Sequence, residues 1–184
     1  MIRDVPDYEA ALCQGLQQNV QEGDHVVVVG GGFGVTAVHA ARHTGKHGHV
    51  TAFEASEEQY NSLEWGVETN GQDEVVTPIH ALVGEEVVVY GETNSAERYS
   101  PEELPECNVL ELDCEGAETE ILRSMEIRPR VLLVETHGFR GAPTDEVAQI
   151  LHGMGYTTTN LGVAEPRIRE ECTENDIYVL LARK

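Results

Sequence analysis

Lysine is almost absent from this chain, because only Lys46 and Lys184 carry that side chain among 184 residues. Lysine and arginine together number 12 against 33 aspartates and glutamates, which gives a formal net charge of -21 at pH 7. Such a surface repels phosphate backbones, so we expect no nucleic acid as substrate or partner. Acid-rich, lysine-poor proteins stay hydrated in concentrated salt, where a Debye length of about 3 Å screens their self-repulsion. We therefore hypothesise a salt-loving host.

Long apolar runs and a secretory leader are also missing. No stretch approaches the ~20 apolar residues that a membrane-spanning helix needs, so we expect no membrane association. Residues 1–4 lack the basic and apolar regions of a signal peptide. No C-x-x-C pair or disulfide-scaffold spacing occurs, which favours buried reduced thiols at Cys13, Cys107, Cys114 and Cys172. These absences predict a cytoplasmic protein.

Strand and helix patterns alternate along the chain, whose length suits one domain over 1–184. An apolar repeat over 8–20, stopped by Gly23, predicts an amphipathic N-terminal helix within 1–23. The β-branched run 26–29 is typical of a buried parallel strand and begins the core over 24–184. Further strands are expected at 49–53, 75–83, 86–90, 108–113, 131–135, 156–161 and 177–182, whereas residues 91–106 are interpreted as a loop. Such alternation predicts an α/β fold with helices on both faces of a mostly parallel sheet and an antiparallel strand pair at the C-terminal end.

A glycine turn follows the first of these strands. Gly30, Gly32 and Gly34 form G-x-G-x-G between strand and helix, where glycine lets a ligand approach the backbone closely. Glu54 ends the second strand, the place at which an acid accepts hydrogen bonds from ribose hydroxyls. Both NAD and S-adenosyl-L-methionine use such a pair of features. NAD requires G-x-G-x-x-G, and Val35 stands where the last glycine would be, so the spacing favours S-adenosyl-L-methionine.

The segment 113–118, Asp-Cys-Glu-Gly-Ala-Glu, resembles the D-x-E-G-A-E signature of FkbM-type methyltransferases. The apolar strand 131–137 with its E-x-H end, and the helix end 151–156, are similar to further blocks of that family. The resemblance covers roughly residues 23–156. It implies a class I methyltransferase with a Rossmann-like, mostly parallel seven-stranded sheet and an antiparallel C-terminal strand. It also implies S-adenosyl-L-methionine as cofactor and O-methylation of a small molecule or sugar.

The resemblance also implies a role for each matching residue. Gly30, Gly32 and Gly34 would hold the methionine part of the cofactor, and Glu54 the ribose, with Ala55 and Ser56 beside the adenosine. The adenine would be bordered by His80 and Ala81. Asp113 would sit where cofactor and acceptor meet, and the acceptor would be faced by Glu135 and His137. Two positions depart from the usual pattern: Val28 replaces an acid that many methyltransferases carry, and Glu111 replaces a frequent lysine.

Transfer of a methyl group to a hydroxyl requires a base. Asp113, Glu135 and His137 are the candidates, and His137 has the most suitable unperturbed pKa. The same three side chains suit a metal ion, which we rank below the base role, and we expect no metal. Glu118 is interpreted as helix-start electrostatics, while the role of Glu115 is left open.

Other readings of the chain compete with an O-methyltransferase. His39, His43 and His47 have ligand spacing on a helix, but the glycines at 45 and 48 end that helix too early for a metal site. An NAD-dependent Rossmann oxidoreductase and a non-catalytic cofactor-binding module are the alternative functions. The short chain has no added cap or substrate domain, which gives the non-catalytic module some weight. A homo-oligomer could supply the missing wall of the acceptor pocket.

Overall fold

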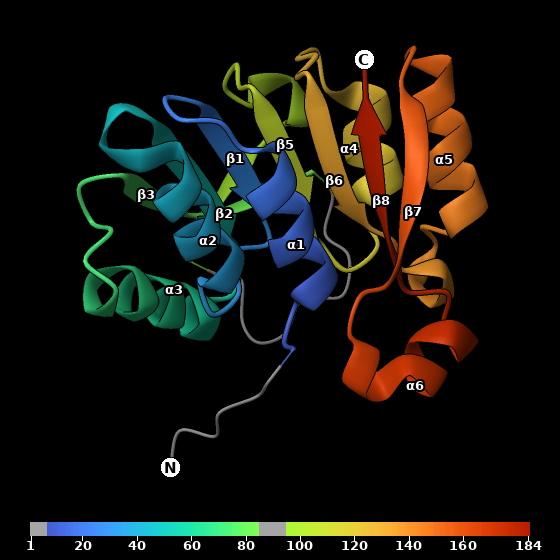
Figure 1. Ribbon diagram of the computed structural model, residues 1–184, viewed down its shortest axis with the longest axis horizontal. Coiled ribbons are helices and arrows are strands. Elements are labelled where there is room, and N and C mark those ends of the chain that lie inside the picture. Colours follow the sequence, from blue (N-terminus) through green and yellow to red (C-terminus); the bar gives the residue numbers. More distant parts are fainter. Residues whose placement is uncertain (1–6, 85–94) are drawn as a thin grey trace.

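The computed structural model describes residues 7–84 and 95–184. An eight-stranded sheet of order β4-β3-β2-β1-β5-β6-β8-β7 forms their centre (Figure 1). Its strands are β1 His25–Val29, β2 His49–Glu54, β3 Val76–Val83, β4 Glu97–Tyr99, β5 Val109–Leu112, β6 Val131–Glu135, β7 Thr157–Val163 and β8 Tyr178–Arg183. Strands β1 to β6 pair in parallel, whereas β8 lies antiparallel between β6 and β7. The predicted α/β fold is confirmed.

Helices cover both faces of the sheet. One face carries α1 (Ala10–Asn19), α2 (Val35–Thr44) and α3 (Glu57–Thr69), and the other carries α4 (Glu118–Ser124) and α5 (Thr144–Gly153). The side chains of β5 alternate between the two layers, as the pleat of a strand requires. Leu110 and Leu112 pack in the α4–α5 layer, while Val109 packs in the layer of α1 to α3.

Two short elements were not predicted. Residues 91–106 contain β4, which is three residues long and pairs only with β3, so the sheet has eight strands instead of seven. A helix α6 (Arg169–Glu174) lies within the C-terminal hairpin and buries only Cys172. Both are too short to give an apolar period that distinguishes them from a loop. The strand expected at 86–90 lies outside the described residues.

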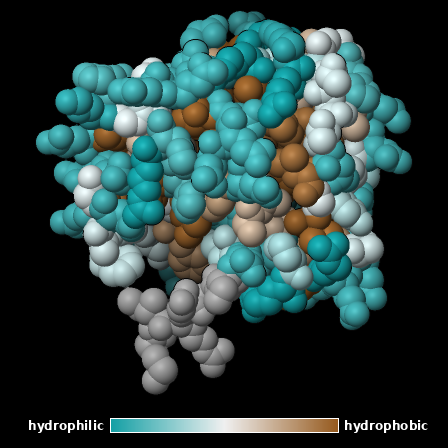
Figure 2. Space-filling model, viewed as in Figure 1, coloured by the Kyte–Doolittle hydropathy of each residue, from teal (hydrophilic) through white to brown (hydrophobic). Residues whose placement is uncertain are grey.

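The surface agrees with the composition. Figure 2 shows hydrophilic residues over most of one face, and the large exposed apolar side chains are Phe33, Trp65 and Phe139. Within 7–84 and 95–184, no helix has both the length and the hydrophobicity to cross a bilayer.

Strand order reverses between β1 and β5, because β1 pairs with β2 on one side and with β5 on the other. Open α/β sheets bind their ligands at such a switch point, outside the carboxyl ends of the strands. The fold therefore places the candidate site beyond Val29, Glu54 and Leu112.

Candidate active site

The glycine turn closes tightly against the neighbouring strands. Gly30 and Gly31 both donate their N–H groups to the Phe53 carbonyl, at 3.0 and 2.9 Å. A Cβ atom at Gly30 would overlap the carbonyl oxygen of Asp113, so this glycine is needed for strand packing. At Gly32 (φ 49°) the one atom of the described residues within 4 Å of a Cβ would be Glu9 Oε1, at 3.9 Å. The open space above Gly32 is therefore available to a ligand.

Glu54 links the glycine turn to the end of β2. Its Oε2 accepts the Gly32 N–H and its Oε1 accepts the Ser56 N–H, both at 2.8 Å. Ser56 is the N-cap of α3, where its hydroxyl accepts the Gln59 N–H. Burial raises the pKa of Glu54 and these backbone donors oppose that effect. A carboxylate has about four lone-pair sites, so Glu54 retains acceptor capacity toward the cavity.

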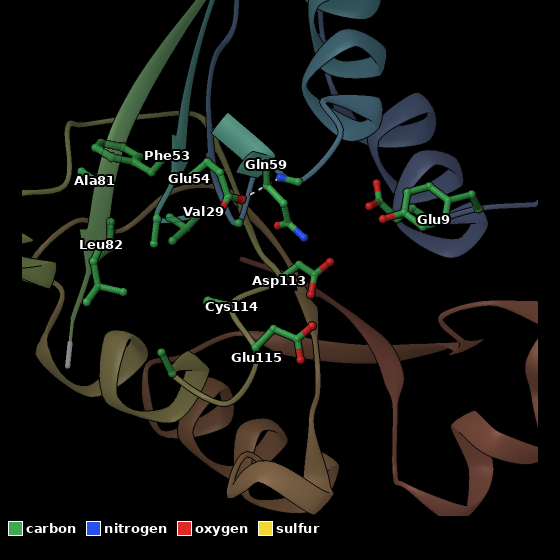
Figure 3. Close-up of a pocket in the computed structure, with 16 residues that line it drawn as sticks. Glu9, Val29, Phe53, Glu54, Gln59, Ala81, Leu82, Asp113, Cys114 and Glu115 are labelled. Carbon is green, nitrogen blue, oxygen red and sulfur yellow. Dashed lines mark hydrogen bonds between the residues drawn. The ribbon is translucent and has the colours of Figure 1, made fainter. Parts of the chain in front are cut away.

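A cavity that is open to solvent lies beyond these strand ends (Figure 3). It is lined by Tyr8, Glu9, Val29, Gly30, Gly32, Phe53, Glu54, Ala55, Gln59, Ala81, Leu82, Val83, Asp113, Cys114, Glu115 and Ala117. The wall is apolar near β3 and acidic near β5, so it suits a ligand with an aromatic part and a cationic part.

A buried histidine adjoins the acidic end of the cavity. His137 Nδ1 lies 2.8 Å from Glu118 Oε1, while Nε2 faces carboxylate oxygens of Asp113, Glu115 and Glu135 at 3.6, 3.7 and 3.8 Å. Burial alone would lower the pKa of His137, but the hydrogen bond to Glu118 and the charges of Asp113, Glu118 and Glu115 raise that pKa to about 9. At neutral pH His137 is therefore an imidazolium held among acids.

Asp113 and Glu135 have raised pKa values. Burial raises the pKa of Asp113 to about 7, with His137 opposing and Glu115 and Glu118 reinforcing the rise. Burial and the nearby charge of Asp113 raise the pKa of Glu135 well above its usual range. Asp113 is thus the group in this cluster whose protonation changes near neutral pH.

Glu118 does more than complement a helix dipole. It lies in the first turn of α4, as the sequence indicates, but it is fully buried and also accepts N–H groups from Cys114 and Gly116, each at 3.0 Å. Glu115 has a left-handed backbone (φ 56°) and pairs with Arg140 at 3.2 Å. The signature 113–118 therefore folds as a loop around the Glu118 carboxylate.

The two departures noted in the sequence are neighbours. Val28 in β1 and Glu111 in β5 lie opposite each other in the parallel register. Glu111 is completely buried, and neither of its carboxyl oxygens has a partner at normal hydrogen-bond distance within the described residues, although the Thr36 side chain opposes the rise of its pKa. Burial, together with the charges of Asp113 and Glu9, raises its pKa far above the usual range. The apolar residue on β1 thus lies beside a buried acid on the adjacent strand.

The structure brings most of the predicted cofactor residues to the cavity. Its lining includes Gly30, Gly32, Glu54, Ala55, Ala81 and Asp113. The lining does not include Gly34, Ser56 and His80, which support it from behind: Gly34 is the N-cap of α2, and the His80 ring lies 3.2 Å from the Ala55 carbonyl and stacks on Tyr60. Glu135 and His137 lie beside the cavity, in contact range of Asp113.

Among the lining residues that sequence reasoning missed are Tyr8 and Glu9. Both belong to the start of the N-terminal helix, which the apolar repeat assigned to packing alone. Their place over Gly32 depends on how α1 docks against α2 and the sheet, and no local motif indicates it.

One group of side chains in the described residues has metal-ligand geometry. Asp113, Glu135 and His137 offer donor atoms that all lie within 4.8 Å of one another. A metal at this position would have to displace the proton that the imidazole carries below about pH 9. The helix α2 ends at Thr44, so His47 lies in a separate turn from His39 and His43.

No family model matches the chain, and a search of curated proteins finds no match. Solved structures do resemble it. Precorrin-6y C5,15-methyltransferase from Geobacter metallireducens has 14% identity and a TM-score of 0.63, covering 96% of this chain and 87% of its own. Fibrillarin from Aeropyrum pernix, solved with natively bound S-adenosyl-L-methionine, has 16% identity and a TM-score of 0.61, covering 94% and 73%. A S-adenosylmethionine-dependent O-methyltransferase from Thermotoga maritima has 18% identity and a TM-score of 0.60, covering 100% and 67%.

These likenesses establish the class of fold: the chain has the Rossmann-like fold of class I S-adenosylmethionine-dependent methyltransferases. The cavity described above lies at the carboxyl edge of that fold, at the β1/β5 switch point.

Proposed function

We propose that the chain is a S-adenosyl-L-methionine-dependent methyltransferase of the FkbM type, which methylates an oxygen atom of a small molecule or sugar. The observation that carries this proposal is the arrangement of Glu54 and the glycine turn. Glu54 tethers Gly32 and keeps free lone pairs beside an open glycine surface, in a cavity with an acidic end. The residues present therefore fit a cationic nucleoside cofactor whose ribose hydroxyls donate to Glu54.

The bound cofactor supplies an activated methyl group on a sulfonium, so the protein mainly has to align the acceptor and exclude water. In our proposal Gly30, Gly32 and Gly34 give the methionine part a close backbone approach. Glu54, with Ala55 and Ser56, holds the ribose side, and the adenine lies toward His80 and Ala81. The apolar side chain of Leu82 extends that wall.

We assign the general base to Asp113. It lines the cavity, and its pKa of about 7 lets it accept the proton of an attacking hydroxyl near neutral pH. His137, which is the base favoured by unperturbed pKa values, is protonated at that pH and instead stabilises the Asp113 carboxylate. Glu135 lies next to Asp113 on the acceptor side. All three therefore belong to the catalytic cluster in different roles.

Binding and transfer test the proposal separately. In concentrated KCl, the Tm should rise when S-adenosyl-L-methionine or S-adenosylhomocysteine is added. A ligand at 100 times its Kd adds about 2.7 kcal/mol to the free energy of unfolding. Stabilisation by NAD alone would instead favour an oxidoreductase. Transfer of labelled methyl groups across a panel of sugars and hydroxylated metabolites tests catalysis. Cofactor binding with no transfer to any acceptor would favour a non-catalytic binding module.

The charge of -21 also supports a small-molecule acceptor over nucleic acid. The same charge supports a location in a cytoplasm rich in salt. A halophilic protein of this composition should unfold on dialysis into low-salt buffer and refold when KCl is restored. Equal stability in fresh and salted buffer would contradict that origin. Sedimentation in the same brine tests whether a homo-oligomer completes the acceptor pocket.

A further inference from the structure

We propose that Glu9 forms a binding site for a primary ammonium group, the one on the amino-acid part of the cofactor. The inference rests on the proposed function and adds a residue that lies outside the glycine turn and outside the signature 113–118. It makes the start of α1 part of the cofactor site.

The geometry of Glu9 directs its carboxylate into the cavity. Glu9 is the N-cap of α1 and has a left-handed backbone (φ 50°, ψ 32°), and Asp7 before it is also left-handed (φ 66°). Non-glycine residues adopt this conformation rarely, and its strain persists only where the surrounding fold holds it. Glu9 Oε1 lies 3.9 Å from the place of a Cβ at Gly32, and Glu9 lines the same cavity as Gly32 and Asp113.

The position of Glu9 along the cavity fits an amino-acid group. In Figure 3 Ala81 and Leu82 lie at one side, Glu54 lies between, and Glu9 lies at the opposite side. A ligand whose adenine rests near Ala81, and whose ribose binds Glu54, therefore extends its amino-acid end across Gly32 toward Glu9. This placement also keeps the reacting sulfur of the cofactor near Asp113, the proposed base. The ammonium group then lies beyond the sulfur, on the Glu9 side of the cavity.

The surroundings of Glu9 call for a cation. Glu9 as a whole residue is 9% exposed, and among the described residues no lysine or arginine is found in an ion pair with it. Burial, Asp113 and Glu165 raise its pKa to about 8, while Tyr8 and the backbone of Thr36 oppose the rise as hydrogen-bond donors. An ammonium group would restore the ionised form of this buried acid.

The β1 strand explains why an acid is needed at this place. Val28 is apolar, and Glu111 beside it is completely buried. Neither residue lines the cavity. Glu9 is the acid that reaches the cavity from the α1 side of the glycine turn. The charge that many methyltransferases carry on β1 is thus supplied here by the start of α1.

Two ligands that differ only in the amino-acid part test the inference. S-adenosylhomocysteine carries the ammonium, whereas 5′-methylthioadenosine has the same adenosine and sulfur without it. In calorimetric titrations, Glu9→Gln should weaken S-adenosylhomocysteine about 10-fold or more, because it removes one partner of a buried charge pair. It should change the affinity for 5′-methylthioadenosine less than about twofold. Glu22→Gln, an exposed acid beyond the other end of α1, should change neither affinity.

If Glu9→Gln loses affinity equally for both ligands, the inference is overturned, because Glu9 would then act only by stabilising the fold. No binding of either ligand to the wild-type protein would reject the proposed function itself.

If Glu9→Gln does not fold, the protons that the wild-type protein releases on binding each ligand test the inference instead. At pH 7.5, titrations in two buffers of different ionisation enthalpy should show more protons released with S-adenosylhomocysteine than with 5′-methylthioadenosine. Tyr8, Asp113, Glu111 and Glu165 also face Glu9, and the difference between ligands removes their shared contribution. Equal proton release would overturn the inference.

Discussion

The imidazole Nδ1 of His137 lies 2.8 Å from Oε1 of Glu118, and the two side chains are 4% and 0% exposed. The same carboxylate accepts backbone N–H groups from Cys114 and Gly116. Glu118 therefore joins the loop that follows β5 to the histidine that follows β6. This buried acid holds the signature loop and, together with Asp113 and Glu115, raises the pKa of the imidazole.

Glu118→Gln should lower the pKa of His137 from about 9 toward its usual value, since an amide cannot stabilise the imidazolium as a carboxylate does. It should also cost about 2 kcal/mol of unfolding free energy, because hydrogen bonds to a buried charge are lost. NMR titration of the His137 ring and chemical denaturation measure the two effects. Glu126→Gln, an exposed acid after α4, is the matched control and should change neither. A His137 pKa that stays near 9 in Glu118→Gln would show that Glu118 does not set it.

Stability should fall as pH rises from about 5 to 9. Asp113, Glu9 and His137 have folded-state pKa values of about 7, 8 and 9, all above their ordinary values. A raised pKa means that the folded chain holds protons the unfolded chain has released, so its contribution is lost as pH rises through the folded value. Each pH unit with one extra bound proton changes the free energy of unfolding by about 1.4 kcal/mol. Calorimetric Tm values in constant brine check this, and a Tm that rises toward pH 9 would contradict it.

Asp113→Asn should reduce kcat for methyl transfer by about 100-fold or more, the size of a lost general base. In the wild-type protein kcat should rise with pH through about 7, where Asp113 loses its proton. The variant should lose this inflection. His137→Gln should move the inflection upward, because the imidazolium lowers the pKa of Asp113. An unchanged inflection near pH 7 in Asp113→Asn would assign the base to another residue.

Removal of metal ions should leave methyl transfer within about twofold, because the protonated His137 offers no lone pair to a metal at neutral pH. Activity before and after treatment with EDTA, with Mg²⁺, Mn²⁺ and Zn²⁺ added back, measures this. Loss of activity that one of these ions restores would instead make Asp113, Glu135 and His137 metal ligands.

The parts of the site that depend on local sequence were predictable. The β-branched run 26–29 locates the end of β1, and Glu54 ends β2, so the sequence predicts that Gly30, Gly32 and Glu54 lie at strand ends; all three line the cavity. The signature 113–118 likewise brought Asp113 there.

Other features depend on strand order and helix docking. The contact of Val28 with Glu111 follows from β5 pairing with β1, and the approach of Glu9 to Gly32 follows from α1 packing on α2. The raised pKa of His137 comes from acids of the loop after β5, which meet a histidine that follows β6. No periodicity or spacing in the chain reports such long-range proximity.

The central claim is that Glu54 accepts hydrogen bonds from the ribose hydroxyls of the cofactor. Calorimetry in brine on the wild-type protein and on Glu54→Gln tests it most directly. The wild-type protein should bind both S-adenosyl-L-methionine and S-adenosylhomocysteine. Glu54→Gln should weaken both by about 10-fold or more, because charged hydrogen bonds to the ribose hydroxyls are lost. Absence of binding heat for both ligands with the folded wild-type protein, or unchanged affinities in Glu54→Gln, would contradict the account.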